Sequence, residues 1–282
     1  MKTFHKQILF AGALGAIVVL TSPSQAFGAE IPAFGSASDF AVLSAAPNHG
    51  GAVTCTDSTV TGDVGSSGYR ASVVETRCTI TGAIIAPVSA QVIADFENAY
   101  GSFANATCDE TLTGTLAGIT LAPGVYCFDA AAVLTGTLTL AGPANGIWLF
   151  KIGTSGTGAL TGTDFTVLMA DGAEACNVYW WVAEAATMTT SAFKGTILAG
   201  AAITVTGGDF EGRALAKAAV TLTDAGVSGC GGSASVRARC NQGVGNGPES
   251  CDPGNSNQGD PSRSNDELGG TPGDPGRKGG NK

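Results

Sequence analysis

One stretch of the chain repeats itself after 17 residues, and this repeat constrains the fold more than any other feature. Residues 193–206 read FKGTILAGAAITVT and residues 210–223 read FEGRALAKAAVTLT, with Phe, Gly, Leu and the Thr-x-Thr ending in the same columns. A short, fixed period is typical of stacked structural units, none of which buries its apolar face alone. Because aliphatic residues alternate with threonine, the units are strands and not helices. The repeat therefore predicts the coils of a β-solenoid.

The composition fits such a fold. Only 13% of the residues are charged, and 42 of the 282 residues are glycine. Small residues turn tight corners, and threonine is favourable on an exposed strand. The shared period favours one domain, which we assign to residues 27–230. Residues 231–282 are rich in Gly, Pro, Asn, Ser and Asp with almost no apolar residues, so they predict a flexible tail.

The first residues have the pattern of an export signal. Lys2 and Lys6 precede an apolar run over residues 8–20, and Ser24-Gln25-Ala26 supplies a small-x-small cleavage pattern. The alternative, a membrane anchor, needs about 20 apolar residues. We therefore predict a signal peptide over residues 1–26 and a secreted, extracellular protein. Without Lys2 and Lys6, 12 basic residues face 23 acidic ones, a net charge of −11 that argues against nucleic acid or membrane as a partner.

Eight cysteines lie in the mature part of the chain, which favours disulfides in an oxidising compartment. Pairs that are close in the sequence are the simplest prediction: Cys55 with Cys78, Cys108 with Cys127, and Cys240 with Cys251. The sequence argues against Cys176 with Cys230, because about three coils at ~4.8 Å each would separate them. A metal site is not expected, since no two cysteines stand as C-x-x-C and the mature chain has one histidine. We predict no cofactor.

Only one segment has the pattern of a long helix. Pro87 is suited to a first helical turn, and residues 88–104 follow it. One apolar stripe runs along this segment at spacings of three and four, formed by Val92, Phe96, Ala99, Tyr100 and Phe103. A single amphipathic helix in a β chain is expected to lie along the sheet. The aromatic segments 121–128, 146–152 and 178–182 are predicted as strands whose rings fill the core or contact this helix.

Alignment of the coils on an apolar-Thr-Gly signature places threonines in two outward columns, with one inward apolar residue between each pair. The aligned pairs are Thr59/Thr61, Thr79/Thr81, Thr111/Thr113, Val133/Thr135, Ala159/Thr161, Thr187/Thr189, Thr204/Thr206 and Thr221/Thr223. The register is open in two coils, where Thr137 and Thr163 are alternatives. Stacked strands would space these threonines ~4.8 Å apart across coils and roughly 6.7 Å apart along one. The predicted result is a flat, uncharged array of methyl and hydroxyl groups, which is able to order water into an ice-like layer.

Several segments, in order, resemble the secreted microbial ice-binding proteins that have a discontinuous right-handed β-solenoid with a long α-helix alongside. The matching segments are 40–43, 61–65, 121–126, 134–140, 147–153, 175–178, 193–199 and 212–216. The resemblance implies a mainly β protein whose solenoid has a triangular cross-section. It also implies that one flat face meets ice. The candidate ice-binding residues are Thr135, Thr137, Thr161, Thr163, Thr187, Thr189, Thr204, Thr206, Thr221 and Thr223.

Two other classes of function compete with ice binding. A polysaccharide-cleaving enzyme would need clustered carboxylates or a general base, but Lys151, Lys194 and Arg213 are scattered and His49 stands in a glycine-rich segment. We therefore predict no enzyme. A surface structural or adhesion module would show the same fold and the same threonine columns. The prediction is a monomeric protein whose partner is the surface of an ice crystal, with adhesion as the alternative.

Overall fold

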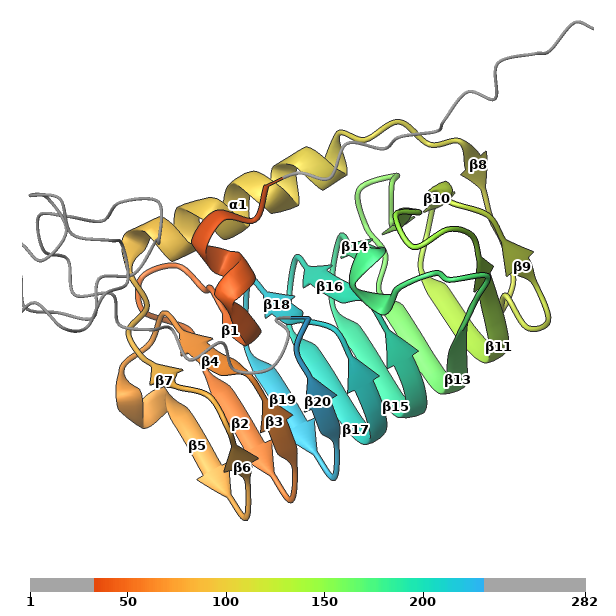
Figure 1. Cartoon of the computed structure of the whole chain (residues 1–282). Helices are drawn as coiled ribbons and strands as arrows, with labels where there is room; N and C mark the ends of the chain where they lie inside the picture. Colours follow the sequence, from red (N-terminus) through yellow and green to blue (C-terminus); the bar gives the residue numbers. More distant parts are fainter. Residues whose placement is uncertain (1–32, 231–282) are drawn as a thin grey trace, which may run out of the picture.

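The computed structural model describes residues 33–230, and they form a stack of parallel β-strands with one long helix beside it (Figure 1). Every strand pairing in the stack is parallel, as a solenoid requires. The predicted β-solenoid is thus confirmed, while its right-handedness and triangular cross-section stay predictions. The expected signal peptide (1–26) and tail (231–282) lie outside the described residues. Within the described part, no helix is long and apolar enough to cross a membrane.

The strands form two sheets. The sheet beside the helix has nine strands, in the spatial order β7 (Ile84–Ile85), β4 (Asp63–Ser66), β1 (Phe40–Ser44), β18 (Ala214–Ala216), β16 (Thr196–Ala199), β14 (Val178–Val182), β12 (Trp148–Ile152), β10 (Gly124–Phe128) and β8 (Glu110–Thr111). The second sheet has the order β5 (Val73–Thr76), β2 (Val53–Thr56), β19 (Val220–Thr223), β17 (Ile203–Glu211), β15 (Ala186–Lys194), β13 (Leu160–Ala170), β11 (Ala132–Ala141) and β9 (Thr120–Leu121). Three further strands extend the second sheet beside β17: β20 (Gly226–Ser228), β3 (Thr59–Thr61) and β6 (Thr79–Ile80).

The order of the coils in space differs from their order in the chain. The last strands β18, β19 and β20 lie between the first strands β1, β2 and β3 and the rest of the stack. The helix carries the chain from one end of the stack to the other, because β7 and β8 are the two edge strands that flank it in sequence. Its 15 residues span about 22 Å. The solenoid is therefore discontinuous, as the resemblance implied.

A corner residue with left-handed backbone divides each coil of the second sheet into two segments. Asp57, Arg77, Asp164, Thr190 and Asp224 occupy this corner with φ between 47° and 52°. Glycine, Asn and Asp tolerate this conformation best, and glycine fills the corner of β17 as Gly207. The segments before the corner form one face of the stack, here called the threonine face. The segments after it form the neighbouring face, here called the charged face.

Two apolar clusters hold the fold. The larger one fills the inside of the stack and contains a column of stacked rings, Tyr126, Phe150 and Trp180, with the last two only 4.0 Å apart between centroids. The smaller cluster lies between the nine-stranded sheet and the helix, and Leu149, Tyr179 and Trp181 face the helix there. The aromatic strands thus pack on both of their sides, as predicted.

The helix α1 (Ala90–Ala104) begins two residues later than predicted and ends where expected. The Ser89 side chain accepts a hydrogen bond from the Val92 N–H and caps the first turn. Four stripe residues are buried, namely Val92, Phe96, Ala99 and Phe103. At the other end, the buried Lys151 Nζ donates to the carbonyls of Ala104 and Ala106, 2.8 Å and 2.6 Å away. This ammonium satisfies carbonyls that the helix end leaves without partners, and burial lowers the pKa of Lys151.

Three disulfides are present among the described residues. Cys55–Cys78 and Cys108–Cys127 match the prediction. The expectation against Cys176 with Cys230 was wrong, because these residues form a disulfide with 5.4 Å between their Cα atoms. Cys176 lies in a short 3-10 helix (Ala175–Asn177) before β14, and that segment lines the same hollow as residues of β20. The distance estimate assumed that both cysteines stay on their own coils. The predicted Cys240–Cys251 pair lies outside the described residues.

Candidate functional site

The threonine face consists of seven neighbouring strand segments whose outward residues form two columns. One column contains Val74, Thr54, Thr221, Thr204, Thr187, Thr161 and Val133, in spatial order. The other contains Thr76, Thr56, Thr223, Thr206, Thr189 and Thr163, and Thr135 follows at the end of the stack. Twelve of these fourteen positions are threonine, none is charged, and the two valines stand at the ends.

The alternation of the strands fixes these side chains on the surface. Between the two columns lies an inward column that is fully buried over its central part, with Leu222, Val205 and Met188 on successive coils. Most of the outward threonines are only half-buried, because each lies between two neighbours of similar size. The terminal Val74 and Val133 are 48% and 57% exposed. Threonines on parallel neighbours in register are ~4.8 Å apart, so the face is a regular two-dimensional array.

The array has no titratable group of its own. The nearest charges stand at its corner, where the Arg77 guanidinium donates hydrogen bonds to the Asp57 carboxylate. This hydrogen bond lowers the pKa of Asp57, so the corner pair stays ionised around neutral pH. A second corner contact links neighbouring coils, since Thr190 Oγ1 donates to Asp164 Oδ1 at 2.5 Å. The corner is held by side-chain contacts, while the array keeps its hydroxyls available to solvent.

Several threonines that the sequence alignment placed in the columns lie elsewhere. Thr59, Thr61 and Thr79 belong to β3 and β6 on the charged face, and Thr111 pairs with Cys127 in the nine-stranded sheet. Thr81 and Thr113 follow β6 and β8, outside the threonine face. Thr137 pairs with Thr166 after the corner, so this candidate also lies on the charged face. In the coil of β13, Thr163 and not Ala159 accompanies Thr161. The other nine candidate residues lie on the threonine face.

Three threonines of the face were missed from the sequence, namely Thr54, Thr56 and Thr76. A sequence pattern could have identified two of them, Thr54 and Thr56. The pattern Thr-x-Thr-Asp occurs at residues 54–57, 161–164 and 221–224, and in each case the aspartate is the left-handed corner residue. Aspartate tolerates that conformation, so the pattern marks the end of the threonine face in three coils.

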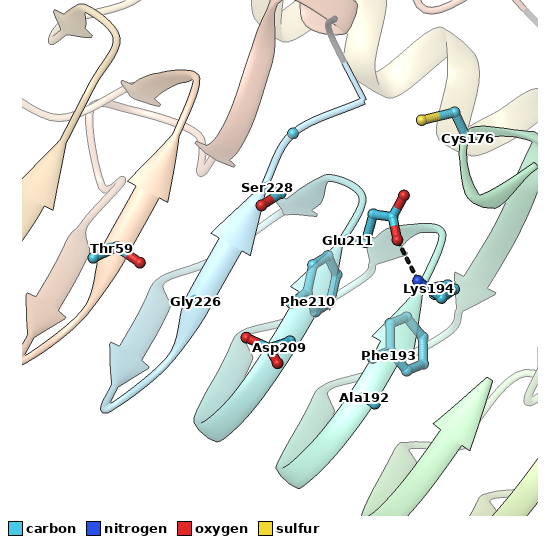
Figure 2. A pocket seen from close by; sticks show the side chains of 11 residues that line it. Thr59, Cys176, Ala192, Phe193, Lys194, Asp209, Phe210, Glu211, Gly226 and Ser228 are labelled. Carbon is cyan, nitrogen blue, oxygen red and sulfur yellow. Dashed lines mark hydrogen bonds and ion pairs between the residues drawn. The ribbon is translucent and has the colours of Figure 1, made fainter. Parts of the chain in front are cut away.

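The charged face has a different surface, although strands β13, β15 and β17 run through both faces. Ala192, Asp209, Gly226 and Thr59 form one outward row across four strands. In the next row, Lys194 lies beside Glu211 and the two side chains form an ion pair (Figure 2). The small side chains beside Asp209 leave a hollow of about 480 Å³ that Cys176 also lines. This face is therefore neither uniform nor uncharged.

Nothing in the described residues resembles a catalytic centre. No group of three or more His, Cys, Asp or Glu side chains within residues 33–230 is arranged to hold a metal ion. The His49 Nδ1 lies 2.9 Å from the Ser67 carbonyl oxygen, and its ring stacks on Tyr69. On the helix side, Lys151 and Arg213 donate to backbone carbonyls, and Lys217 forms an ion pair with Glu97. These groups support the structure.

Comparison with known proteins identifies the family. The Ice-binding-like family model matches residues 47–228. The chain is 37% identical over 196 residues to an ice-binding protein of Nostoc sp. (strain HG1), covering 67% of this chain and 70% of that protein. It is 31% identical over 216 residues to the ice-binding protein K3-B1 of Typhula ishikariensis, covering 67% and 86%.

Solved structures agree with this result. An ice-binding protein from an Antarctic biological consortium superposes with a TM-score of 0.63 at 31% identity, covering 70% of this chain and 90% of that one. The ice-binding protein of the Antarctic ascomycete Antarctomyces psychrotrophicus gives a TM-score of 0.62 at 31% identity, covering 69% and 96%. The discontinuous solenoid, its flanking helix and these matches agree, and the chain belongs to the Ice-binding-like family.

Proposed function

We propose that this protein adsorbs to ice through the threonine face and thereby inhibits the growth or recrystallisation of ice. The observation that carries the proposal is the array of twelve threonines in two columns on seven coils, without a single charge. The methyl groups disfavour disordered hydration, and the hydroxyls hydrogen-bond water at the regular spacing of the coils. An array held by a packed core presents this spacing without having to become ordered at the ice surface.

Family membership supports the same function, because the relatives and the solved structures are named ice-binding proteins. A solved relative from Arctic yeast is described by its antifreeze activity. We infer that this chain is likewise a binding protein and not an enzyme. We also propose that it is secreted, since its signal-like first residues and its disulfides fit an oxidising, extracellular environment.

The test is a pair of matched double substitutions. Thr189 and Thr206 are neighbours at the centre of the threonine face, whereas Thr137 and Thr166 are neighbours on the charged face. Thr189→Tyr with Thr206→Tyr inserts two bulky rings into the array. This variant should lose ice shaping and recrystallisation inhibition, while its thermal midpoint stays near that of the unmodified protein, because both side chains point away from the core.

Thr137→Tyr with Thr166→Tyr is the control and should keep full activity. The opposite pattern, with loss only in the control, would transfer the ice-binding role to the charged face. A folded, unmodified protein that leaves ice crystals unshaped would reject ice binding and favour a surface structural or adhesion role for the same fold.

A further inference from the structure

The charged face contains a groove that nothing in the proposed ice-binding role uses. Two adjoining hollows of about 480 Å³ and 500 Å³ lie on it and share Cys176, Lys194 and Glu211 as lining residues. Strands β13, β15, β17 and β20 contribute to its floor, and the segment around Cys176 forms its wall (Figure 2). Leu168, 51% exposed, lies at one end. The groove is thus long, partly apolar and open along the direction of the stack.

The groove has an excess of negative charge. Lys194 is neutralised by its ion pair with Glu211. Asp209 and Glu174 also line the two hollows, and neither forms an ion pair with any residue in the range 33–230. Two carboxylates thus stand along the groove with no cation beside them, which suits a basic, extended ligand.

The chain itself supplies such a ligand at this place. Cys230 is tied to the groove wall by its disulfide with Cys176, and 52 residues follow it, 231–282. Residues 233–239 read SASVRAR, in which small apolar residues alternate with serine and arginine. Arg237 and Arg239 are the first charged residues after Cys230. An extended chain of seven to nine residues reaches about 23–30 Å, enough to cross the four strands of the floor at ~4.8 Å each.

We propose that residues 233–239 dock in this groove of the charged face, with Arg237 and Arg239 paired to Asp209 and Glu174. The period-2 alternation places both arginines on one side of the segment and Ala234, Val236 and Ala238 on the other. The disulfide restrains the segment beside its binding site and so raises its effective concentration there. The charged face is then an internal docking surface, and this holds whether or not the threonine face binds ice.

Limited trypsin digestion of the oxidised full-length protein tests the proposal, because trypsin cleaves after Arg237 and Arg239 only when they are accessible. Docking should slow these two cleavages by about tenfold relative to cleavage after Arg263, with each rate normalised to the same site in the denatured chain. The variant Asp209→Lys with Glu174→Lys repels the arginines and should restore fast cleavage at both sites, and 1 M salt should act in the same direction. Cleavage after Arg263 is the internal control and should not change.

A charge reversal outside the lining of the groove, Asp129→Lys with Glu110→Lys, should leave all the rates as they are in the unmodified protein. Cleavage after Arg237 and Arg239 as fast as after Arg263 in the unmodified protein would overturn the proposal. So would slow cleavage that the groove reversal leaves unchanged, since the disulfides alone would then account for it. Ice activity measured on the same samples reports separately on the threonine face.

Discussion

Strands β13, β15 and β17 each contribute one segment to the threonine face and, after a corner residue, a second segment to the charged face. Both faces share the same parallel register and the same buried core. On the threonine face the five central coils repeat threonine at both outward positions, and only the two end coils contain an outward valine. On the charged face the outward residues change from threonine to alanine, aspartate, lysine and glutamate within a few coils.

This difference separates what the fold requires from what the function requires. Both faces fold with alternating inward and outward residues, so threonine is not needed for the solenoid. The fold tolerates Asp209 and the Lys194–Glu211 pair at equivalent outward positions. Uniformity over the five central coils is therefore an additional property of the threonine face, and the proposed contact with ice depends on it.

The largest effect on activity is expected when the ion pair of the charged face is placed on the threonine face. Thr189 and Thr206 lie opposite each other just as Lys194 and Glu211 do, on the same two strands. The variant Thr189→Lys with Thr206→Glu should therefore fold normally. It should lose about tenfold or more of its recrystallisation inhibition, because charged groups keep their own hydration and resist the removal of water at the ice surface.

The measurement is the lowest concentration that stops recrystallisation, compared with the thermal midpoint of the same variant. Full activity in this folded variant would show that a uniform, uncharged array is not required. The matched variant Lys194→Thr with Glu211→Thr should not gain activity, since the segment around Cys176 still stands over that surface.

The corner that separates the two faces gives the next largest effect, and two adjacent glycines distinguish its causes. An added Cβ at Gly208 would lie 2.3 Å from the Ser191 carbonyl oxygen, whereas one at Gly207 would meet nothing closer than 3.4 Å. Both residues have positive φ. Gly208→Ala should cost about 3 kcal/mol, from backbone strain and overpacking together. Gly207→Ala should cost about 1 kcal/mol, for the left-handed conformation alone.

Thermal unfolding measures the effects of both glycine substitutions. We expect the midpoint to fall by about 10 °C for Gly208→Ala and by about 3 °C for Gly207→Ala. Equal effects of the two substitutions would mean that the corner relaxes easily. The two faces would then be less rigidly separated than the contact distances indicate.

The solenoid, the helix and two disulfides could be predicted because each leaves a local signal. The 17-residue period and the apolar stripe of the helix are patterns over short stretches, and Cys55–Cys78 and Cys108–Cys127 close short segments. The neighbours of β18, β19 and β20 could not be predicted in this way. They pair with β1, β2 and β3, and no local pattern encodes contacts between the two ends of a chain.

The threonine face could be predicted only in part, because the Thr-Gly signature occurs at two different corners. In Thr206-Gly207 the glycine turns from the threonine face to the charged face. In Thr61-Gly62 it turns from the charged face to the nine-stranded sheet. Glycine serves both turns because both need positive φ. Aligning on this dipeptide therefore mixed two faces and displaced Thr54 and Thr56 from the array.

The smallest effect is expected for the response of ice binding to pH, because the threonine face is uncharged. Its fourteen outward positions carry no titratable group. The Asp57 carboxylate at its corner has a pKa lowered from 3.8 by the hydrogen bond from Arg77. Its favourable contribution to folding is therefore fully present above pH 3.8 and is lost only as the pH falls through the lower pKa of the folded state.

Recrystallisation inhibition should accordingly stay constant between about pH 5 and pH 9, where neither the array nor its corner pair changes charge. A change of ice activity within the range from pH 5 to pH 9 in a folded sample would show that a titrating group takes part in binding. That result would contradict an uncharged threonine face as the ice-binding site.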